Sequence, residues 1–274
     1  MIEVEQFSYC YSNGMEVLKD INLKIPKSSI VLITGPTGCG KTSLCRAIQG
    51  TIPQFYGGKM KGSVKINGLN TRKTSLATLT AQVGMVFQEP TFQIIGGTIE
   101  QDIAFGLENL NIPSKEIKER ISHILDRFNI EPFRIRTPES LSGGEKAIVA
   151  LASVAVMQPK VMILDEVTTQ LDFQNTQRVL KLVSELHDSG ITILMISHRL
   201  EHLLPLADSL LVMQNGQVHF FGDVREGIKD SKVADLILTP PVVQLFQRLR
   251  EMGISVPEIP LNPEQAFETL KTLL

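Results

Sequence analysis

Several features are scarce in this sequence, and each absence excludes a class of protein. The formal net charge is only −2, which argues against a broad basic surface, so we expect no nucleic-acid partner. There are three cysteines, Cys10, Cys39 and Cys45, and they show no metal-ligand spacing. An odd number of cysteines without such spacing predicts free thiols in a reducing compartment.

Long hydrophobic runs are also missing. The longest stretch of apolar or small residues, at 148–157, is shorter than the roughly 20 residues of a membrane-spanning helix. The chain does not start with a signal-peptide pattern, and we therefore expect a cytosolic or peripheral protein. Its 274 residues, of which 43% are hydrophobic, allow one large domain with an appendage or two small domains.

One motif organises the rest of the chain. Residues 35–42 fit the phosphate-binding pattern G-x-x-x-x-G-K-[ST] at every fixed position. An apolar run at 30–33 predicts a strand before it and 42–48 predicts a helix after it, which is the context that the motif requires. Lys41 is expected to reach the β- and γ-phosphates of a nucleotide, and Thr42 to hold Mg²⁺. A glycine-rich turn that binds nothing is the alternative, and both flanks disfavour it. The expected nucleotide contacts in this loop are Gly35, Pro36, Thr37, Gly38, Cys39, Gly40, Lys41, Thr42 and Ser43.

Two further stretches carry chemistry. An apolar strand predicted at 161–165 ends in Asp165, which can hold Mg²⁺, and Glu166, which can polarise a water for attack on the γ-phosphate. A solvated turn is the alternative for this pair. Leu-Ser-Gly-Gly-Glu at 141–145 predicts a second anion site, built from a hydroxyl, bare N–H groups and a helix dipole. One nucleotide does not need two such sites from the same subunit.

The remaining pattern predicts an α/β fold with a P-loop nucleotide-binding core and a mixed sheet. Alternating residues at 2–7, 21–25 and 63–66 indicate an N-terminal antiparallel β-subdomain. Apolar runs at 83–87, 161–165 and 191–196 indicate buried parallel strands, and 208–221 a closing hairpin.

Helical patterns interrupt and follow this core. A helix capped by Ser114 and another that begins near Ser142 indicate an inserted helical subdomain at about 90–157. Prolines beyond Gly222 punctuate short helical patterns and mark a small C-terminal extension. The expected domains are therefore 1–222 and 223–274.

The order of these motifs resembles that of the ATP-binding cassette (ABC) ATPases. The phosphate loop, Gln88 after a strand, the Leu-Ser-Gly-Gly-Glu segment, Asp165-Glu166, Leu171-Asp172 and His198 after a strand occur in that family's order over residues 1–222.

The resemblance implies that two such subunits pack head to tail around ATP and Mg²⁺. Ser142 and Gly144 of one subunit would then contact the γ-phosphate held by Lys41 of the other, and Asp172 would cross the interface. Gln88 would sense Mg²⁺ and the attacking water, His198 would hold the γ-phosphate and the water, and Tyr11 would stack on adenine, with Tyr9 as the alternative. The expected catalytic residues are Glu166, His198, Gln88 and Lys41, the metal ligands are Thr42, Gln88 and Asp165, and the further nucleotide contacts are Tyr11, Ser142, Gly143, Gly144, Glu145 and Asp172.

The sequence also departs from the pattern of the family. Val167 stands where Pro is usual, Gln170 replaces a small residue, and Ala147-Ile148 replaces Gln-Arg. These departures favour a heterodimer with two unequal sites over a homodimer. His198 and His202 have the spacing of a zinc pair, but no third ligand is evident nearby.

Residues 86–109 and the tail are similar to those of the energy-coupling factor ATPases. Within that group a second glutamine follows the Gln-x-Pro step, and Gln93 fits that place. The resemblance implies a subunit that energises uptake of a vitamin or a transition metal ion from the cytoplasmic face of the cell membrane. Its partners would be a second ABC ATPase subunit, an integral-membrane scaffold docked on the helical subdomain, and a substrate-capturing membrane subunit. The alternatives are the ATPase of another ABC importer or exporter, and a soluble ABC protein that acts on nucleic acid or ribosomes.

Overall fold

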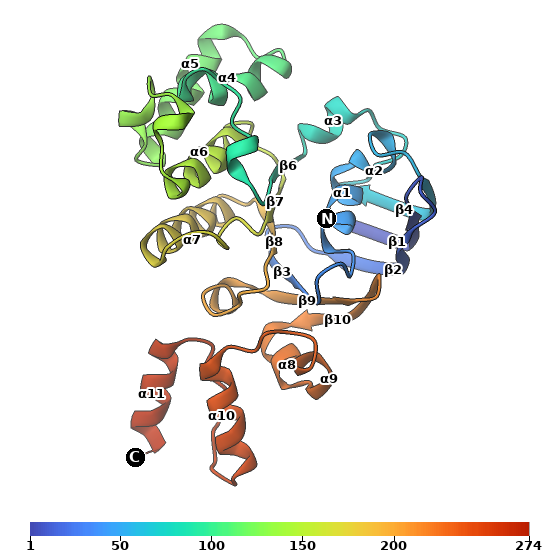
Figure 1. Ribbon diagram of the computed structural model, residues 1–274, viewed down its shortest axis with the longest axis vertical. Helices are drawn as coiled ribbons and strands as arrows, with labels where there is room; N and C mark the ends of the chain where they lie inside the picture. The colour runs from blue at the N-terminus through green and yellow to red at the C-terminus, as the bar shows by residue number, and fades with distance from the viewer. Residues whose placement is uncertain (274) are drawn as a thin grey trace.

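A six-stranded sheet forms the centre of the molecule (Figure 1). The computed structural model describes residues 1–273, with the side chains of residues 1–271. The strand order is β10-β9-β3-β8-β7-β6, with β10 antiparallel to β9 and the other neighbouring pairs parallel. The prediction of a mixed sheet is confirmed. Its strands are β3 (Ile30–Thr34), β6 (Val83–Val86), β7 (Val161–Asp165), β8 (Thr192–Ile196), β9 (Ser209–Gln214) and β10 (Gln217–Asp223).

Burial explains why the parallel strands read as continuous apolar runs. Every residue of β3, β6, β7 and β8 is buried, because the sheet is covered on both faces. The carboxyl ends of these strands meet at one edge of the sheet. This edge is where an open α/β sheet binds its ligands.

A second, antiparallel sheet lies beside the first, as predicted. Its order is β2-β1-β4-β5, formed by β1 (Ile2–Cys10), β2 (Glu16–Ile25), β4 (Lys59–Ile66) and β5 (Leu69–Asn70). Helix α1 (Lys41–Gln49) packs between the two sheets, where Leu44 and Ile48 share one core cluster with Phe7 of β1 and Ile33 of β3. The helix that follows the phosphate loop is therefore fixed from both sides. Two short helices, α2 (Thr51–Gln54) and α3 (Leu76–Thr80), flank β4 and β5 along the chain.

A helical subdomain is inserted between β6 and β7 and lies at the top of Figure 1. In α5 the apolar residues Ile117, Ile121 and Ile124, which are spaced three or four positions apart, are buried. The cap predicted for this helix is wrong: Pro113 is the N-cap residue, and no side chain caps the helix. Pro113 holds an extended backbone, so Ser114 is already the first helical residue. The elements are η1 (Pro90–Phe92), α4 (Ile99–Asn109), α5 (Ser114–Arg127), η2 (Glu131–Phe133), η3 (Pro138–Ser140) and α6 (Gly143–Ala155).

Helix α8 (Val224–Lys229) contacts β9 and β10 of the six-stranded sheet, and the later C-terminal helices extend the same core. Val224, Val233 and Phe246 belong to the same core cluster as Leu210 and Val212 of β9. The tail is therefore not held by a separate core of its own, and the predicted limit near residue 222 stays a prediction. Helix α7 (Phe173–Asp188) joins β7 to β8, η4 (Leu204–Leu206) precedes β9, and the tail comprises α8 (Val224–Lys229), α9 (Ser231–Ala234), α10 (Pro241–Glu251) and α11 (Pro263–Leu273). Within residues 1–273, none of the helices has the length and apolar character to cross a membrane.

Candidate active site

The phosphate loop lies between the end of β3 and the start of α1. Gly35 has φ 134°, and a Cβ there would overlap the carbonyl oxygen of Met213, so only glycine fits. Lys41 is 6% exposed, and its Nζ donates to the carbonyl oxygens of Gly35 (2.8 Å) and Pro36 (3.0 Å). The ammonium group is thereby held inside the loop, at the N-terminus of α1, where phosphate oxygens are favoured.

Thr42 and Asp165 meet beside this loop although they are 123 positions apart. The Thr42 hydroxyl donates to Asp165 Oδ2 at 3.0 Å. Asp165 is 5% exposed. Burial raises the pKa of its carboxyl group, and the Thr42 hydrogen bond partly offsets that rise. A hydroxyl and a buried carboxylate at this distance are hard oxygen ligands of the kind that Mg²⁺ prefers.

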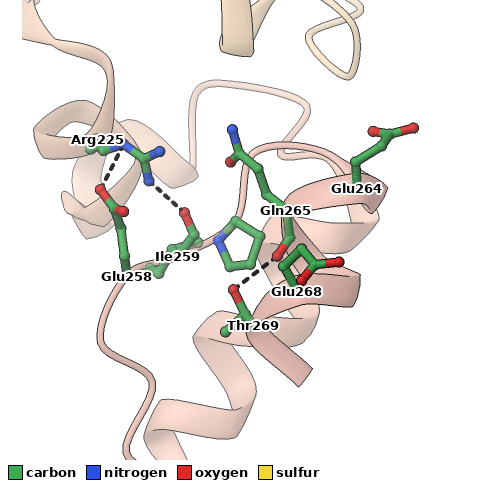
Figure 2. Close-up of a pocket in the computed structure, with 8 residues that line it drawn as sticks. Arg225, Glu258, Ile259, Glu264, Gln265, Glu268 and Thr269 are labelled. Atoms are coloured by element: carbon green, nitrogen blue, oxygen red, sulfur yellow. Dashed lines mark hydrogen bonds and ion pairs between the residues drawn. The ribbon is translucent and has the colours of Figure 1, made fainter. Parts of the chain in front are cut away.

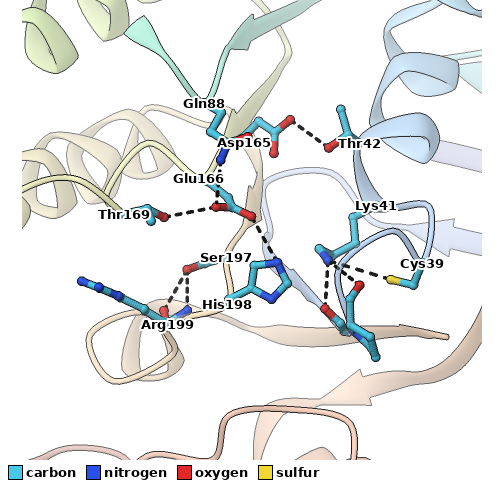
Figure 3. A network of polar contacts seen from close by, with 12 residues as sticks. Cys39, Lys41, Thr42, Gln88, Asp165, Glu166, Thr169, Ser197, His198 and Arg199 are labelled. Carbon is cyan, nitrogen blue, oxygen red and sulfur yellow. Dashed lines mark hydrogen bonds and ion pairs between the residues drawn. The ribbon is translucent and has the colours of Figure 1, made fainter.

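Glu166 is the centre of a polar network at the carboxyl ends of three neighbouring strands (Figure 3). Its Oε1 lies 3.2 Å from His198 Nε2, and its Oε2 accepts from Gln88 Nε2 at 3.4 Å. Gln88 follows β6, Glu166 follows β7 and His198 follows β8, so the strand order brings them together. Glu166 has φ 51°, which is unusual for a residue other than glycine. A strained backbone at such a convergence of polar groups supports a functional role.

Local hydrogen bonds fix the other members of this network. Thr169 Oγ1 donates to Glu166 Oε2 at 3.4 Å. The Ser197 side chain closes the turn that carries His198, accepting from Arg199 N at 3.0 Å and donating to Arg199 O at 2.9 Å. Neither Thr169 nor Ser197 was predicted, and no motif in the sequence singles them out.

Gln88, Glu166 and His198 line a cleft of about 450 Å³ together with residues of the phosphate loop. Tyr11 lies on its wall and Tyr9 does not: Tyr9 is 1% exposed and its hydroxyl donates to Gly57 O at 2.8 Å. Of these two tyrosines, Tyr11 is therefore the one that a ligand in the cleft could contact. The lining residues are Tyr11, Met15, Val17, Thr37, Gly38, Gly40, Lys41, Thr42, Ser43, Gln88, Glu166 and His198. Met15 and Val17 were not predicted.

The residues of the predicted second anion site lie elsewhere on the same chain. The described residues that line the cleft include none of Ser142, Gly143, Gly144, Glu145 and Asp172. Ser142 caps α6 in a capping box, with Ser142 N donating to Glu145 Oε2 at 2.7 Å and Glu145 N donating to Ser142 Oγ at 3.3 Å. The hydrogen bond from Ser142 N lowers the pKa of the Glu145 carboxyl group.

The predicted anion-binding segment touches Asp172, the residue expected to cross the interface, through one side chain. A Cβ on Gly144 would overlap the Asn175 side chain, and Asn175 Nδ2 donates to Asp172 Oδ2 at 2.8 Å. Asp172 Oδ1 also accepts from Asn175 N as the N-cap of α7, which lowers the pKa of the Asp172 carboxyl group. The start of α6 and the start of α7 are thus held in one arrangement.

Gln93 fixes the segment that leads out of β6. Its Oε1 accepts from Phe87 N at 3.0 Å and its Nε2 donates to Met85 O at 3.1 Å. The sequence marked Gln93 only by its place in a family pattern. The structure gives it a role, which is to hold the backbone just before Gln88.

A second concavity, of about 470 Å³, lies among the C-terminal helices (Figure 2). Arg225 Nε pairs with Glu258 Oε1 at 2.9 Å, and Arg225 Nη1 donates to Ile259 O at 3.0 Å. Both contacts tie the segment before α11 to α8. The polar groups of Arg225 are therefore used within the fold.

Comparison with known proteins agrees with this geometry. Residues 18–169 match the family model described as ABC transporter. The chain is 39% identical to the energy-coupling factor transporter ATP-binding protein EcfA of Methanosarcina acetivorans, over 94% of this chain and 92% of that protein. It is 36% identical to EcfA2 of Caldanaerobacter subterraneus, over 97% and 95%. The structure of cbiO1 from Clostridium perfringens, described as part of the ABC transporter complex cbiONQ, superposes with a TM-score of 0.76 at 30% identity, covering 92% of this chain and 96% of that one.

Proposed function

The chain belongs to the ABC transporter family, and we propose that it is the ATP-hydrolysing subunit of an energy-coupling factor transporter that takes up a vitamin or a transition metal ion. The observation that carries the proposal is the convergence of Gln88, Glu166 and His198 beside the phosphate loop, in a chain that is similar to such subunits over nearly its whole length.

The phosphate loop and Tyr11 bind the nucleotide from two sides of the cleft. The loop N–H groups and Lys41 face the triphosphate, and the ring of Tyr11 stacks on the adenine. Lys41 then exchanges its contacts to Gly35 and Pro36 for phosphate oxygens. This placement is supported by the cleft, which is lined by Tyr11, the phosphate loop and His198.

Thr42 and Asp165 would hold Mg²⁺, with Gln88 beside them. Their fit is supported by the hard oxygen donors that meet at 3.0 Å and by the burial of Asp165. The ion would neutralise charge that develops on the phosphate oxygens. The raised pKa of Asp165 is the expected consequence of burying a carboxylate that is built to face a cation.

Glu166 polarises the attacking water. Its carboxylate accepts from Gln88 and Thr169 and faces His198, so it is oriented from three sides. A positioned general base contributes about 10²- to 10⁴-fold to a rate. His198 holds the γ-phosphate and the water in place during attack.

A second ATPase subunit completes the site. The segment 142–145 lies outside the cleft of its own chain, so it would contact the nucleotide of a partner in a head-to-tail dimer. Because ATP then binds the closed dimer better than the open one, its binding energy can drive closure. The departures at Val167, Gln170 and Ala147-Ile148 favour a paralogous partner over a second copy.

The helical subdomain docks on an integral-membrane scaffold at the cytoplasmic face of the membrane. It exposes large apolar side chains, with Phe92 79%, Ile95 64% and Phe105 49% exposed. Exposed apolar groups of this size on one subdomain are typical of an interaction surface. A separate membrane subunit would capture the transported substrate.

Co-purification tests the proposal. The tagged chain is purified from detergent-solubilised native membranes, and its companions are identified by mass spectrometry. We expect a paralogous ATPase, one scaffold membrane protein and a small membrane binding subunit. A different pair of membrane domains would keep the transport ATPase and reject the energy-coupling factor assignment, and ribosomes or nucleic acid without a membrane protein would reject transport.

A pair of variants tests the docking surface. Phe92→Asp should lose the scaffold protein and keep the affinity for ATP. Leu238→Asp is the matched control, because Leu238 is 70% exposed and lies outside the helical subdomain. Retention of the scaffold by Phe92→Asp would contradict the proposed docking.

A further inference from the structure

Arg46 of α1 is a half-buried charged group for which the roles above give no use. It follows Lys41 on the same helix. Its Nε is buried and finds no hydrogen-bond partner in the described part of the chain. Leaving such a group without a partner costs stability, so the position calls for an explanation.

The guanidinium of Arg46 lies between two aromatic residues. Its central carbon is 4.5 Å from the centroid of the Tyr56 ring, and its Nη1 donates to the Tyr11 hydroxyl in a long hydrogen bond of 3.5 Å. A planar guanidinium can stack on one ring while its N–H groups donate sideways to another group, whereas a lysine ammonium has no plane to stack. The arrangement therefore selects arginine over lysine.

Tyr11 is fixed through its hydroxyl group and by a T-shaped ring contact. Its hydroxyl lies 3.1 Å from Ser43 Oγ, so it contacts two residues of α1. Its ring makes a T-shaped contact with the ring of Tyr9, with the centroids 4.8 Å apart. Tyr11 nevertheless lines the cleft, so the ring is held in one orientation while it stays available to a ligand.

Tyr56 is itself held against α1. Its N–H donates to Thr51 O at 3.1 Å, and Thr51 Oγ1 donates to Arg46 O at 3.2 Å. The segment 51–56 thus folds back over the end of α1. It places the Tyr56 ring on the guanidinium.

From these contacts we infer that Arg46 is a positioning residue for nucleobase recognition. Supported by Tyr56, it holds Tyr11 in the orientation that stacks on a purine. The inference rests on the proposed function, in which Tyr11 binds the adenine. It connects base recognition to the helix that begins at the phosphate loop, since Lys41, Ser43 and Arg46 all belong to α1.

The test separates base recognition from phosphate recognition. The affinities of the full-length chain for ATP and for inorganic tripolyphosphate are measured at equilibrium. Mg²⁺ is left out of both measurements, so that metal binding at Asp165 contributes to neither affinity. Arg46→Lys should weaken ATP binding by about three- to ten-fold, the range of one lost hydrogen bond, and leave tripolyphosphate binding unchanged. Tyr11→Leu should have the same selectivity. The double variant should bind ATP no more weakly than Tyr11→Leu alone, because both changes act through one contact.

Tyr56 supplies a second pair of variants in case Arg46→Lys does not fold. Tyr56→Phe keeps the ring that stacks on the guanidinium and should bind ATP like the parent chain. Tyr56→Leu removes the ring and should behave like Arg46→Lys. The pair therefore tests the same contact without changing α1.

Three results would overturn the inference. Equal weakening of ATP and tripolyphosphate by Arg46→Lys would place its effect on the phosphate loop. An unchanged ATP affinity in Arg46→Lys, while Tyr11→Leu is impaired, would leave the proposed function standing and remove the role of Arg46. A parent chain that binds tripolyphosphate as tightly as ATP would remove base recognition by Tyr11 and with it the inference.

Discussion

Gly144 offers a direct test of how α6 is packed. In Gly144→Ala the new Cβ would lie 2.6 Å from Asn175 Oδ1 and overlap the rest of that amide. Asn175 cannot simply rotate away, because its Nδ2 donates to Asp172 Oδ2 at 2.8 Å. The neighbouring Gly143 is the matched control, since a Cβ there meets nothing within 4 Å.

Gly144→Ala should be less stable than Gly143→Ala, because only the Cβ at position 144 overlaps a neighbouring side chain. Forcing an extra carbon into a filled site typically costs about 1–3 kcal/mol. Gly143 is exposed, so its replacement should change the free energy of unfolding by no more than about 0.5 kcal/mol. A difference of at least about 1 kcal/mol corresponds to a melting temperature lower by roughly 2–4 °C for Gly144→Ala.

The assay is thermal unfolding of the two purified full-length variants without nucleotide, followed by circular dichroism. Turnover is not a suitable readout, because both glycines are expected at the interface that holds ATP. Equal melting temperatures would show that Asn175 yields freely and would refute the packing argument. A marked loss of stability in Gly143→Ala would show that its surroundings are not open.

Three other predictions concern the cleft. Glu166→Gln should keep ATP binding and lower turnover of the assembled complex at least about 100-fold, a loss of roughly 3 kcal/mol. Glu201 is exposed, so the control variant Glu201→Gln should have normal turnover. Near-normal turnover in Glu166→Gln would show that Glu166 is not the base. Burial raises the pKa of Asp165, so its ionised carboxylate opposes folding above that pKa. Asp165→Asn should therefore raise the melting temperature of the metal-free chain at pH 7. This gain should disappear at a pH low enough to protonate Asp165. A gain that persists in acid would contradict this cause. Burial also raises the pKa of the Cys39 thiol, so at pH 7 iodoacetamide should modify the partly exposed Cys10 faster than Cys39. Peptide mass spectrometry measures the two rates, and faster modification of Cys39 would contradict its burial in the phosphate loop.

Much of the fold could be predicted because its signals are local. The phosphate loop, the apolar parallel strands and the closing hairpin each show in a few consecutive residues, and the structure has them at nearly the expected limits. The convergence of Gln88, Glu166 and His198 follows from the strands that carry them, since residues that end neighbouring parallel strands meet at one edge.

Other features depend on contacts that no local pattern encodes. Tyr9 lies in β1 and Tyr11 directly follows this strand. Only the hydrogen bond from the Tyr9 hydroxyl to Gly57 O shows that Tyr9 is bound within the fold. The contact between Arg46 and Tyr56 depends on how 51–56 folds back over α1. Ser114 was a plausible cap by residue type, but the extended backbone of Pro113 moved the start of the helix.

The hydrogen bond between Gln88 and Glu166 joins the helical subdomain to the proposed site of ATP hydrolysis. Gln88 stands where the chain leaves β6 for the helical subdomain, and Gln93 anchors that exit. If the proposed membrane partner binds the helical subdomain, a movement of that subdomain would also shift Gln88, which donates to Glu166. ATP hydrolysis would then depend on the position of the membrane partner.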